Sequence, residues 1–244
     1  MTAEPGSTDG LARRCRENLA VVCDRIASAC RAAGRPADAV TLVGVTKYVG
    51  ADVAAVLLAA GCHDLAESRP QQLWEKAAAL AGFPSPPRWH LVGHLQRNKV
   101  RRTLPVVSLI HTIDSIRLLE ELEAEAARAG GRSDVLVEVN LAGDPGRSGA
   151  LVADVPAVAA AAMALSHVRL RGLMGMASHP DTAGADARRD FARLRELRDR
   201  LLGDVPAETL GELSMGMSGD FEAAILEGST LVRIGSALFE GLAD

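Results

Sequence analysis

The feature that most constrains this chain is the alternation of short apolar runs, rich in β-branched residues, with longer segments rich in Ala, Leu, Glu and Arg. Strands that alternate with helices in this way pair in parallel, through right-handed crossovers. Eight runs have the length and composition of strands, at residues 40–46, 63–66, 89–92, 108–112, 135–140, 170–174, 209–215 and 231–234. Eight such units in 244 residues match the size of a (β/α)8 barrel.

Helical patterns fill the intervals between these runs, near residues 51–60, 69–81, 95–104, 115–129, 151–165, 184–202 and 218–227. Another helix is expected near 9–33, capping the barrel bottom or flanking its side, and a short one from about 236. The competing fold is an open doubly wound sheet. It normally has a Gly-rich turn after its first strand, where this chain reads Thr46-Lys47-Tyr48-Val49.

We therefore predict an α/β fold, a single (β/α)8 TIM-type barrel domain over residues 1–244 with an extra N-terminal helix. The first eight residues, which are polar and carry Gly and Pro, are expected to be disordered. Aromatic residues make up only 3% of the chain, so the core must consist of Ala, Val and Leu.

Charge and hydropathy exclude several classes of function. The net charge of −4 gives no general attraction to nucleic acid or to anionic lipid, and the basic run at 97–102 is typical of a solvated helix face. The chain has neither a basic and apolar leader at its start nor a run of 18 apolar residues, so we expect no membrane span.

The four cysteines point to a reducing compartment. Cys15, Cys23 and Cys30 are spaced to lie on roughly one helical stripe, and Cys62 stands apart. No C-x-x-C pair occurs, so neither a zinc site nor a redox dithiol is supported. Small, apolar, reduced cysteines are typical of a cytoplasmic protein.

Active sites of such barrels lie at the carboxyl ends of the strands, and Lys47 ends the first strand. A lysine that closes a buried strand is costly unless it is paired or neutral, and a neutral amine can form a Schiff base with a carbonyl. The simpler alternative is a side chain that reaches solvent from the strand end.

Two segments after the seventh and eighth strands are typical of a phosphate site. Ser214-Met215-Gly216-Met217-Ser218-Gly219-Asp220 leads into a helix with Ser218 as its expected N-cap, and Gly235-Ser236 opens the next one. Small residues let backbone N–H groups approach a phosphate, and these are the loops that recurrently bind one in this barrel. Each Gly or Ser has an equally ordinary role in turns and caps.

Arg233 lies inside the apolar run LVRI of the eighth strand, where it needs an acceptor. A carboxylate such as Glu138 is the ordinary partner. The ring nitrogen of a cofactor is the alternative.

Over residues 10–242 the chain resembles the pyridoxal phosphate (PLP) homeostasis proteins, a family related to the N-terminal barrel of alanine racemase. The resemblance is carried by LVGVTKYV, RWHLVGHLQRNKVR, IHTIDSIRLLEEL, VEVNLAGDPGRSG, LRGLMGM and LSMGMSGDFEAAILEGSTLVRIGSALFEG. It implies PLP as the cofactor, held as an internal Schiff base.

The resemblance also implies a role for each site residue. Lys47 would bind PLP covalently, Arg233 would face its pyridine nitrogen, and the phosphate would be held by a set of residues from the two loops: Ser214, Met215, Gly216, Ser218, Gly235 and Ser236. An arginine cannot accept a proton, so it would leave the ring nitrogen unprotonated and the ring a weaker electron sink. This suits a carrier or a racemase better than a transaminase.

The chain departs from the family pattern twice. Ser68 stands where the family often has an asparagine, and Arg147 where a lysine is common, which puts a PLP-relay role for that lysine in doubt because arginine forms no Schiff base. His90 matches the family histidine, but a strand histidine satisfied by hydrogen bonds is at least as good an interpretation. His90 and His94 lack further ligands, so no metal site is expected.

Three functions are compatible with these residues. The first is a PLP-binding regulator that stores PLP or transfers it to PLP-dependent apoenzymes, with little turnover, as a monomer.

The second is a PLP-dependent amino-acid racemase or lyase, but a racemase needs an acid or base on both faces of the substrate, and the single tyrosine, Tyr48, adjoins Lys47. The sequence ends just after the eighth unit, so we expect no added domain to supply the second group. The third is a Schiff-base aldolase without a cofactor, against which Arg233 and the family motifs argue. We expect the first.

Overall fold

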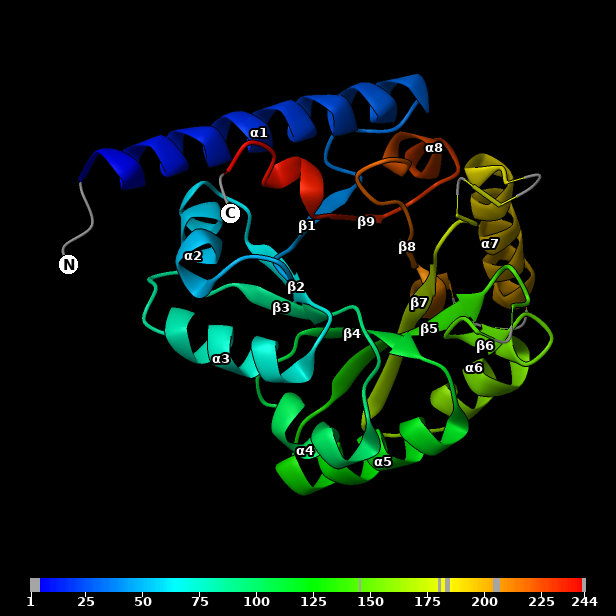
Figure 1. Ribbon diagram of the computed structural model, residues 1–244. Coiled ribbons are helices and arrows are strands. Elements are labelled where there is room, and N and C mark those ends of the chain that lie inside the picture. Colours follow the sequence, from blue (N-terminus) through cyan, green and yellow to red (C-terminus); the bar gives the residue numbers. More distant parts are fainter. Residues whose placement is uncertain (1–4, 145, 180, 183–184, 204–206, 243–244) are drawn as a thin grey trace.

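The alternating runs form parallel strands that close into a barrel in the computed structural model, which describes residues 5–144, 146–179, 181–182, 185–203 and 207–242, without the side chains of 5–9 and 207–208. Eight strands form the wall: β1 Thr41–Val45, β2 Asp64–Glu67, β3 Arg88–Leu91, β4 Leu109–Ile113, β5 Ser133–Asn140, β7 Val168–Gly175, β8 Glu212–Ser214 and β9 Leu231–Ile234. They follow one another in chain order, and the pairing of β1 with β9 closes the ring (Figure 1). The predicted (β/α)8 barrel is confirmed.

Two details of the strands differ from the prediction. The segment predicted as a strand at 209–215 starts within the 3₁₀ turn η2 Ala207–Leu210, and only Glu212–Ser214 pair with neighbours. A two-residue strand, β6 Ala150–Leu151, pairs with the end of β5 and was not predicted. Both differences involve pieces of two to four residues, which are too short for periodicity to identify.

Helices ring the barrel at the predicted positions (Figure 1). They are α1 Pro5–Ala32, α2 Ala51–Ala59, α3 Pro70–Leu80, η1 Arg97–Lys99 with α4 Val100–Thr103, α5 Ile116–Ala129, α6 Val155–Met163, α7 Ala187–Leu202, α8 Phe221–Leu226 and η3 Ser236–Leu238. The last of these is a single 3₁₀ turn, so the eighth unit has no full helix of its own.

Helix α1 compensates for that short last turn. It packs against α2, α8 and η3, and Figure 1 shows it lying along the outside of the barrel beside them. The N-terminal helix therefore flanks the side of the barrel, one of the two positions considered above. Residues 1–4 lie outside the described part of the chain, while 5–8 already belong to α1, so the disorder expected of residues 1–8 stays a prediction for the first four.

The buried face of α1 follows helical spacing. Cys15, Leu19, Val22, Ile26 and Ala29 recur every three or four residues and are all buried. Cys23 is exposed, so our placement of the three helical cysteines on one stripe was wrong for this residue. Eight residues of α-helix turn the side chain about 80° beyond two full rotations, off the stripe that Cys15 occupies.

Apolar residues fill two separate regions. One cluster lies between the strands and the helices, and a smaller one lies inside the barrel, formed by Val43, Val45, Ala66, Leu109, Leu136, Met174 and Leu231. Polar side chains also lie in this interior. Small apolar residues such as Val45 and Ala66 lie towards the carboxyl ends of their strands. In the described part of the chain, no helix is both long and apolar enough to cross a membrane.

Candidate functional site

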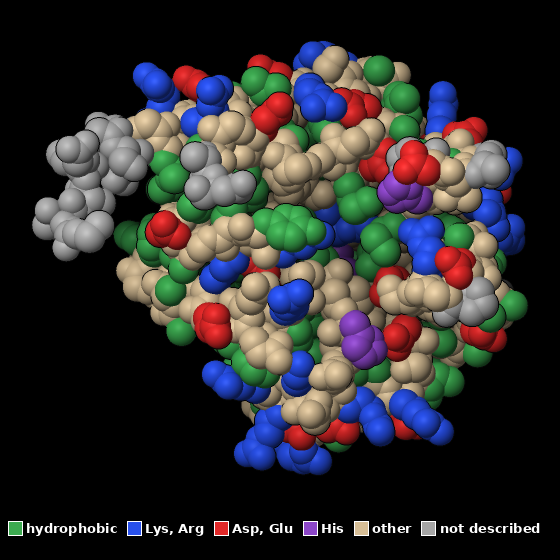
Figure 2. Space-filling model, viewed as in Figure 1, with side chains coloured by type: hydrophobic (Ala, Val, Ile, Leu, Met, Phe, Trp, Pro, Cys, Tyr) green, Lys and Arg blue, Asp and Glu red, His purple; other side chains and the backbone are tan. Residues whose placement is uncertain are grey.

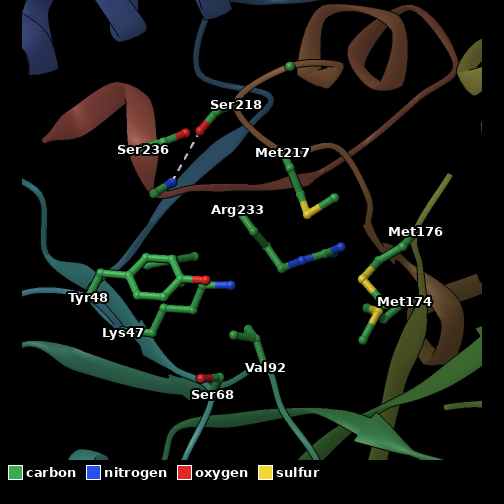
Figure 3. Close-up of a pocket in the computed structure, with 13 residues that line it drawn as sticks. Lys47, Tyr48, Ser68, Val92, Met174, Met176, Met217, Ser218, Arg233 and Ser236 are labelled. Carbon is green, nitrogen blue, oxygen red and sulfur yellow. Dashed lines mark hydrogen bonds between the residues drawn. The ribbon is translucent and has the colours of Figure 1, made fainter. Parts of the chain in front are cut away.

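A cavity of about 340 Å³ lies at the carboxyl ends of the strands, on the face that Figure 2 shows hollowed near its middle. Its lining comes from both ends of the sequence: Val45, Lys47, Tyr48, Ser68, Val92, Met174, Met176, Met217, Ser218, Gly219, Arg233, Gly235 and Ser236. Figure 3 shows Lys47, Ser218 and Ser236 on one side of the cavity, with Arg233 reaching across towards Met174 and Met176. A volume of this size is within the range of small-molecule sites.

Lys47 lies two residues past the end of β1. Val45 and Thr46 are buried, whereas the Lys47 side chain is exposed, with its Nζ 4.7 Å from the centre of the Tyr48 ring. Of the two possibilities considered above, the structure therefore shows the lysine that reaches solvent from the strand end, and not a buried one. The chain turns out of the barrel wall directly after Thr46, which leaves Lys47 at the cavity mouth.

The backbone beside Lys47 is held from below by a buried ion pair. Lys76 of α3 donates to the carbonyl of Thr46 at 2.7 Å and pairs with Glu67 at the end of β2. The Thr46 hydroxyl donates to the same Glu67 oxygen at 2.7 Å. These three side chains tie the ends of β1 and β2 together beneath the cavity, and sequence reasoning missed them because they lie far apart along the chain.

The two predicted phosphate loops do meet on one side of the cavity. Ser218 Oγ accepts from the backbone N–H groups of Gly235 at 3.4 Å and Ala237 at 3.3 Å, which joins the loops (Figure 3). Within the described residues, the backbone N–H groups of Ser218, Gly219 and Ser236 have no acceptor. All three residues line the cavity, so their donors are available to an anion.

Ser214, Met215 and Gly216 are not brought into this cavity. Ser214 is fully buried in the barrel interior and Met215 in the outer core. Gly216 has φ +94°, and a Cβ there would lie 2.7 Å from Ala224 Cβ, so its role is to let α8 pack closely. The family resemblance implied a phosphate role for these three residues together with Ser218, but the strand ends within this segment, and only Ser218 of the four lines the cavity.

The expected N-cap at Ser218 was also wrong. Helix α8 starts two residues later than expected, with Asp220 in the N-cap position, and the Asp220 side chain accepts from the N–H of Met217 at 2.6 Å. Ser218 therefore stays free of the helix and bonds across to the neighbouring loop instead.

Arg233 is buried and lines the cavity floor from β9. Its Nη1 donates to the carbonyl and hydroxyl of Ser214, both at 2.7 Å, and its Nη2 donates to the carbonyl of Gly175 at 3.1 Å. Glu138, the carboxylate partner considered above, accepts instead from the Ser148 hydroxyl at 2.6 Å. Burial lowers the pKa of Arg233 to about 10, although Asp220 and Glu138 act in the opposite direction.

The methionines and Val92 were missed as lining residues. Met176 follows Gly175 at the end of β7, Met217 follows Gly216 in the loop after β8, and Val92 follows β3, so their positions at strand ends were visible. Their apolar side chains carried no chemical signal, because they shape the cavity rather than react in it.

The positions where the chain departs from the family pattern lie on two sides of the site. Ser68 lines the cavity, so its hydroxyl is available where an asparagine amide is common. Arg147 lies in a neighbouring cavity of about 460 Å³ and donates to the carbonyl of Ala177 at 3.1 Å. His90 is buried and bonded to His111 and Asp64, so its interpretation as a hydrogen-bonded strand histidine is confirmed.

Comparison with known proteins gives a consistent set of relatives. Residues 21–242 match the family described as "Alanine racemase, N-terminal domain". A pyridoxal phosphate homeostasis protein of Pseudomonas aeruginosa is 40% identical over 224 residues, 91% of this chain and 94% of that protein. One from Aquifex aeolicus is 37% identical over 223 residues, 91% of this chain and 96% of that protein.

Solved structures agree with these sequences. PipY of Synechococcus elongatus, solved with PLP bound, is 35% identical with a TM-score of 0.78, covering 89% of this chain and 99% of that one. A protein of unknown function from Bifidobacterium adolescentis is 36% identical with a TM-score of 0.86, over 95% and 96% of the two chains. An alanine racemase of Clostridium difficile shares the fold, at 16% identity and a TM-score of 0.70, over 95% of this chain and 61% of that one.

Proposed function

We propose, since the chain belongs to the family of pyridoxal phosphate homeostasis proteins built on the alanine racemase N-terminal domain, that it binds PLP in the cavity at the barrel mouth and acts in PLP homeostasis. The observation that carries this proposal is the meeting of three features in one cavity: an accessible lysine amine, free backbone donors and a buried arginine. Each suits a different part of PLP.

The residues present fit this cofactor. The aldehyde of PLP would be bound by the amine of Lys47, and its phosphate by the free N–H groups of Ser218, Gly219 and Ser236. The guanidinium of Arg233 can only donate, so it suits an unprotonated ring nitrogen. When bound, PLP supplies a reactive aldehyde and an electron-withdrawing ring.

We assign the protein to storage and transfer of PLP, with little turnover of its own. Among the described residues that line the cavity, Lys47 carries the amine and Tyr48 the phenol that could act as acid or base, and the two are adjacent in the chain. Both project from the same turn, so neither is placed to serve the far side of a bound amino acid.

Three further features belong to the same proposal. PLP-dependent apoenzymes are the recipients that such a carrier would serve, and the chain would act as a monomer. A cytoplasmic location suits both, and suits four free cysteines, of which three are buried.

Reduction with borohydride tests the proposal, because it fixes a PLP bound to an amine as a stable secondary amine. The chain has three lysines, Lys47, Lys76 and Lys99, so peptide mass mapping can resolve them. We expect the label on Lys47, loss of the visible absorption band on reduction, and neither result in Lys47→Ala. A label confined to Lys76 or Lys99 would overturn the assignment.

Deuterium incorporation at Cα of L-alanine tests the low turnover. A lone amine beside PLP should give slow exchange with retained configuration, since one positioned acid–base group is typically worth about 10²–10⁴-fold in rate. D-alanine formed at an ordinary enzymatic rate of about 1–10³ per second would favour a racemase instead.

A further inference from the structure

A continuous line of hydrogen bonds crosses the inside of the barrel and ends at Arg233. Starting from the cavity floor, Arg233 Nη1 bonds Ser214 Oγ at 2.7 Å, and Ser214 Oγ bonds His111 Nδ1 at 2.8 Å. His111 Nε2 bonds His90 Nδ1 at 2.9 Å, and His90 Nε2 bonds Asp64 Oδ1 at 3.1 Å. We call these five residues the polar chain.

The polar chain is buried along its whole length. Its five members come from β2, β3, β4, β8 and β9, and each residue is 0–6% exposed. At the far end, Arg88 at the start of β3 donates through Nε to Asp64 Oδ1 at 2.7 Å, with its side chain 64% exposed. The polar chain therefore connects the floor of the cavity to a surface ion pair at the opposite end of the barrel.

The chemistry of the two ends fixes where the protons lie. Arg233 has donors only, so Ser214 Oγ accepts from it and offers its own hydrogen to His111 Nδ1. His111 then carries its proton on Nε2 and donates to His90 Nδ1. His90 carries its proton on Nε2 and donates to the Asp64 carboxylate.

If each hydrogen bond between Ser214 and Asp64 ran in the opposite direction, polar groups would be left unsatisfied at both ends of the polar chain. With His111 protonated on Nδ1, the Ser214 hydroxyl would accept from two donors and its own hydrogen would need another acceptor. With His90 donating from Nδ1, its Nε2 would face the Asp64 carboxylate unless the ring gained a buried positive charge. Unsatisfied or newly charged buried groups are costly, so the arrangement running from Arg233 to Asp64 is favoured.

We propose that Ser214, His111, His90 and Asp64 are positioning residues that hold Arg233 in one orientation on the cavity floor, with both histidines neutral and protonated on Nε2. This rests on the proposed function, in which Arg233 faces the PLP ring. Ser214 Oγ is the side-chain acceptor that Arg233 uses, and its second bond to His111 prevents the hydroxyl from turning away. The other acceptors of Arg233 are backbone carbonyls.

Nitrogen-15 NMR of the PLP-free protein tests the proton arrangement directly. We expect His90 and His111 both to show the neutral Nε2–H pattern at pH 7. Ser214→Ala should move the Nδ1 resonance of His111 towards that of an unbonded ring nitrogen. A proton on Nδ1 of either ring, or a doubly protonated His90, would overturn the proposal.

PLP affinity and the visible spectrum test the positioning role. His111→Phe should weaken PLP binding about tenfold and shift the absorption maximum, because the Ser214 hydroxyl that accepts from Arg233 is no longer held in place, and bonds to charged groups are the stronger ones. Thr112→Val is the matched control: it removes a buried hydroxyl on the same strand as His111, which donates to the carbonyl of Gly93 after β3, outside the polar chain. The control should change affinity less than twofold.

Combining variants separates positioning from a general loss of structure. In an Arg233→Gln background, adding His111→Phe should weaken PLP less than twofold further, since the group it positions is gone. Equal losses from His111→Phe in both backgrounds, or equal losses in His111→Phe and the control, would contradict the positioning role. Failure of the Lys47 labelling experiment would overturn the proposed function alone, because the NMR result does not depend on PLP.

Discussion

Lys47 and Lys76 show how differently one residue type is used around this cavity. Lys47 is exposed at the mouth, where its amine is accessible to a ligand. Lys76 is buried and bonded to Glu67 and to the Thr46 carbonyl, so it stabilises the barrel wall and is not accessible to a ligand. At the scale of single residues, accessibility decides which lysine can react.

The buried Lys76–Glu67 pair predicts a large effect on stability. Lys76→Met should lower the free energy of unfolding by about 3–5 kcal/mol, because it leaves the fully buried Glu67 carboxylate without its partner. Urea denaturation measures this, with Lys99→Met as the control. Adding Glu67→Gln to Lys76→Met should recover part of the loss, and a cost below about 1 kcal/mol for the single variant would contradict the prediction.

Two members of the polar chain make stability depend on pH. Burial, aided by the nearby His90 and Arg233, holds the pKa of His111 well below 6.5. Burial alone would raise the pKa of Asp64, but hydrogen bonds from His90 and Arg88 outweigh it and lower that pKa to about 2. In both cases the unfolded chain binds a proton at a higher pH than the folded protein does.

The sign of the pH effect follows. Stability from His111 is complete above pH about 6.5 and is lost as pH falls below it, and a further loss from Asp64 follows from about 4 towards about 2. Thermal unfolding between pH 8 and 4 should therefore show a falling melting temperature, with a smaller slope in His111→Phe than in wild type. An unchanged slope would exclude His111 as its source.

Among the elements of the fold, the loops after β8 and β9 form the side of the cavity whose backbone N–H groups are available to an anion. The second loop also packs closely against β1: a Cβ on Gly235 would lie 3.3 Å from the carbonyl oxygen of Val45. The helices that follow are only six and three residues long, so the donors come from the loop backbone more than from helix ends.

A substitution at Gly235 therefore tests phosphate binding. Gly235→Val should weaken PLP at least tenfold and pyridoxal, which lacks the phosphate, much less, because the added side chain crowds the loop beside Ser236. Fluorescence titration with both ligands measures the difference. Gly211→Val is the control, since no atom lies within 4 Å of a Cβ at that position. Equal losses for the two ligands would show that this loop does not bind the phosphate.

At the scale of the whole molecule, the last unit of the barrel is completed by the first helix. Helix η3 is one turn, and α1 packs across it, α2 and α8. The two ends of the sequence meet there: the Asn18 side chain donates to the carbonyls of Leu238 at 3.1 Å and Glu240 at 2.9 Å. The turn that directly follows the Arg233 strand is thus held by a helix from the other end of the chain.

This arrangement predicts that α1 is required for stability. Ile26→Ala, on the buried face, should lower the free energy of unfolding by about 2–4 kcal/mol through lost burial and a cavity. Val21→Ala, at a position that is 58% exposed on the same helix, should cost less than about 0.5 kcal/mol. Similar costs for the two, measured by urea unfolding, would mean that α1 is not part of the core.

From local patterns alone we could predict the barrel, the position of Lys47 and the two loops that carry Ser218, Gly235 and Ser236. These follow from local order, because the alternation of runs sets the fold class and the carboxyl ends of parallel strands must share one face. The assignment of Ser214 to the cavity also failed for a local reason. The strand β8 is too short for its end to be recognised, and that end separates Ser214, which lies inside the barrel, from Ser218, which lies past the strand.

Which side chains meet depends on how the strands and helices are assembled. His90 and His111 pair because β3 and β4 are neighbours in a particular register, and Ser214 reaches His111 across 103 residues of sequence. The place of α1 beside η3 and the pairing of Lys76 with Glu67 are decided in the same way. Local patterns fix which face of a strand or helix is buried, but register and closure of the barrel fix its partner, and these depend on contacts that no single segment contains.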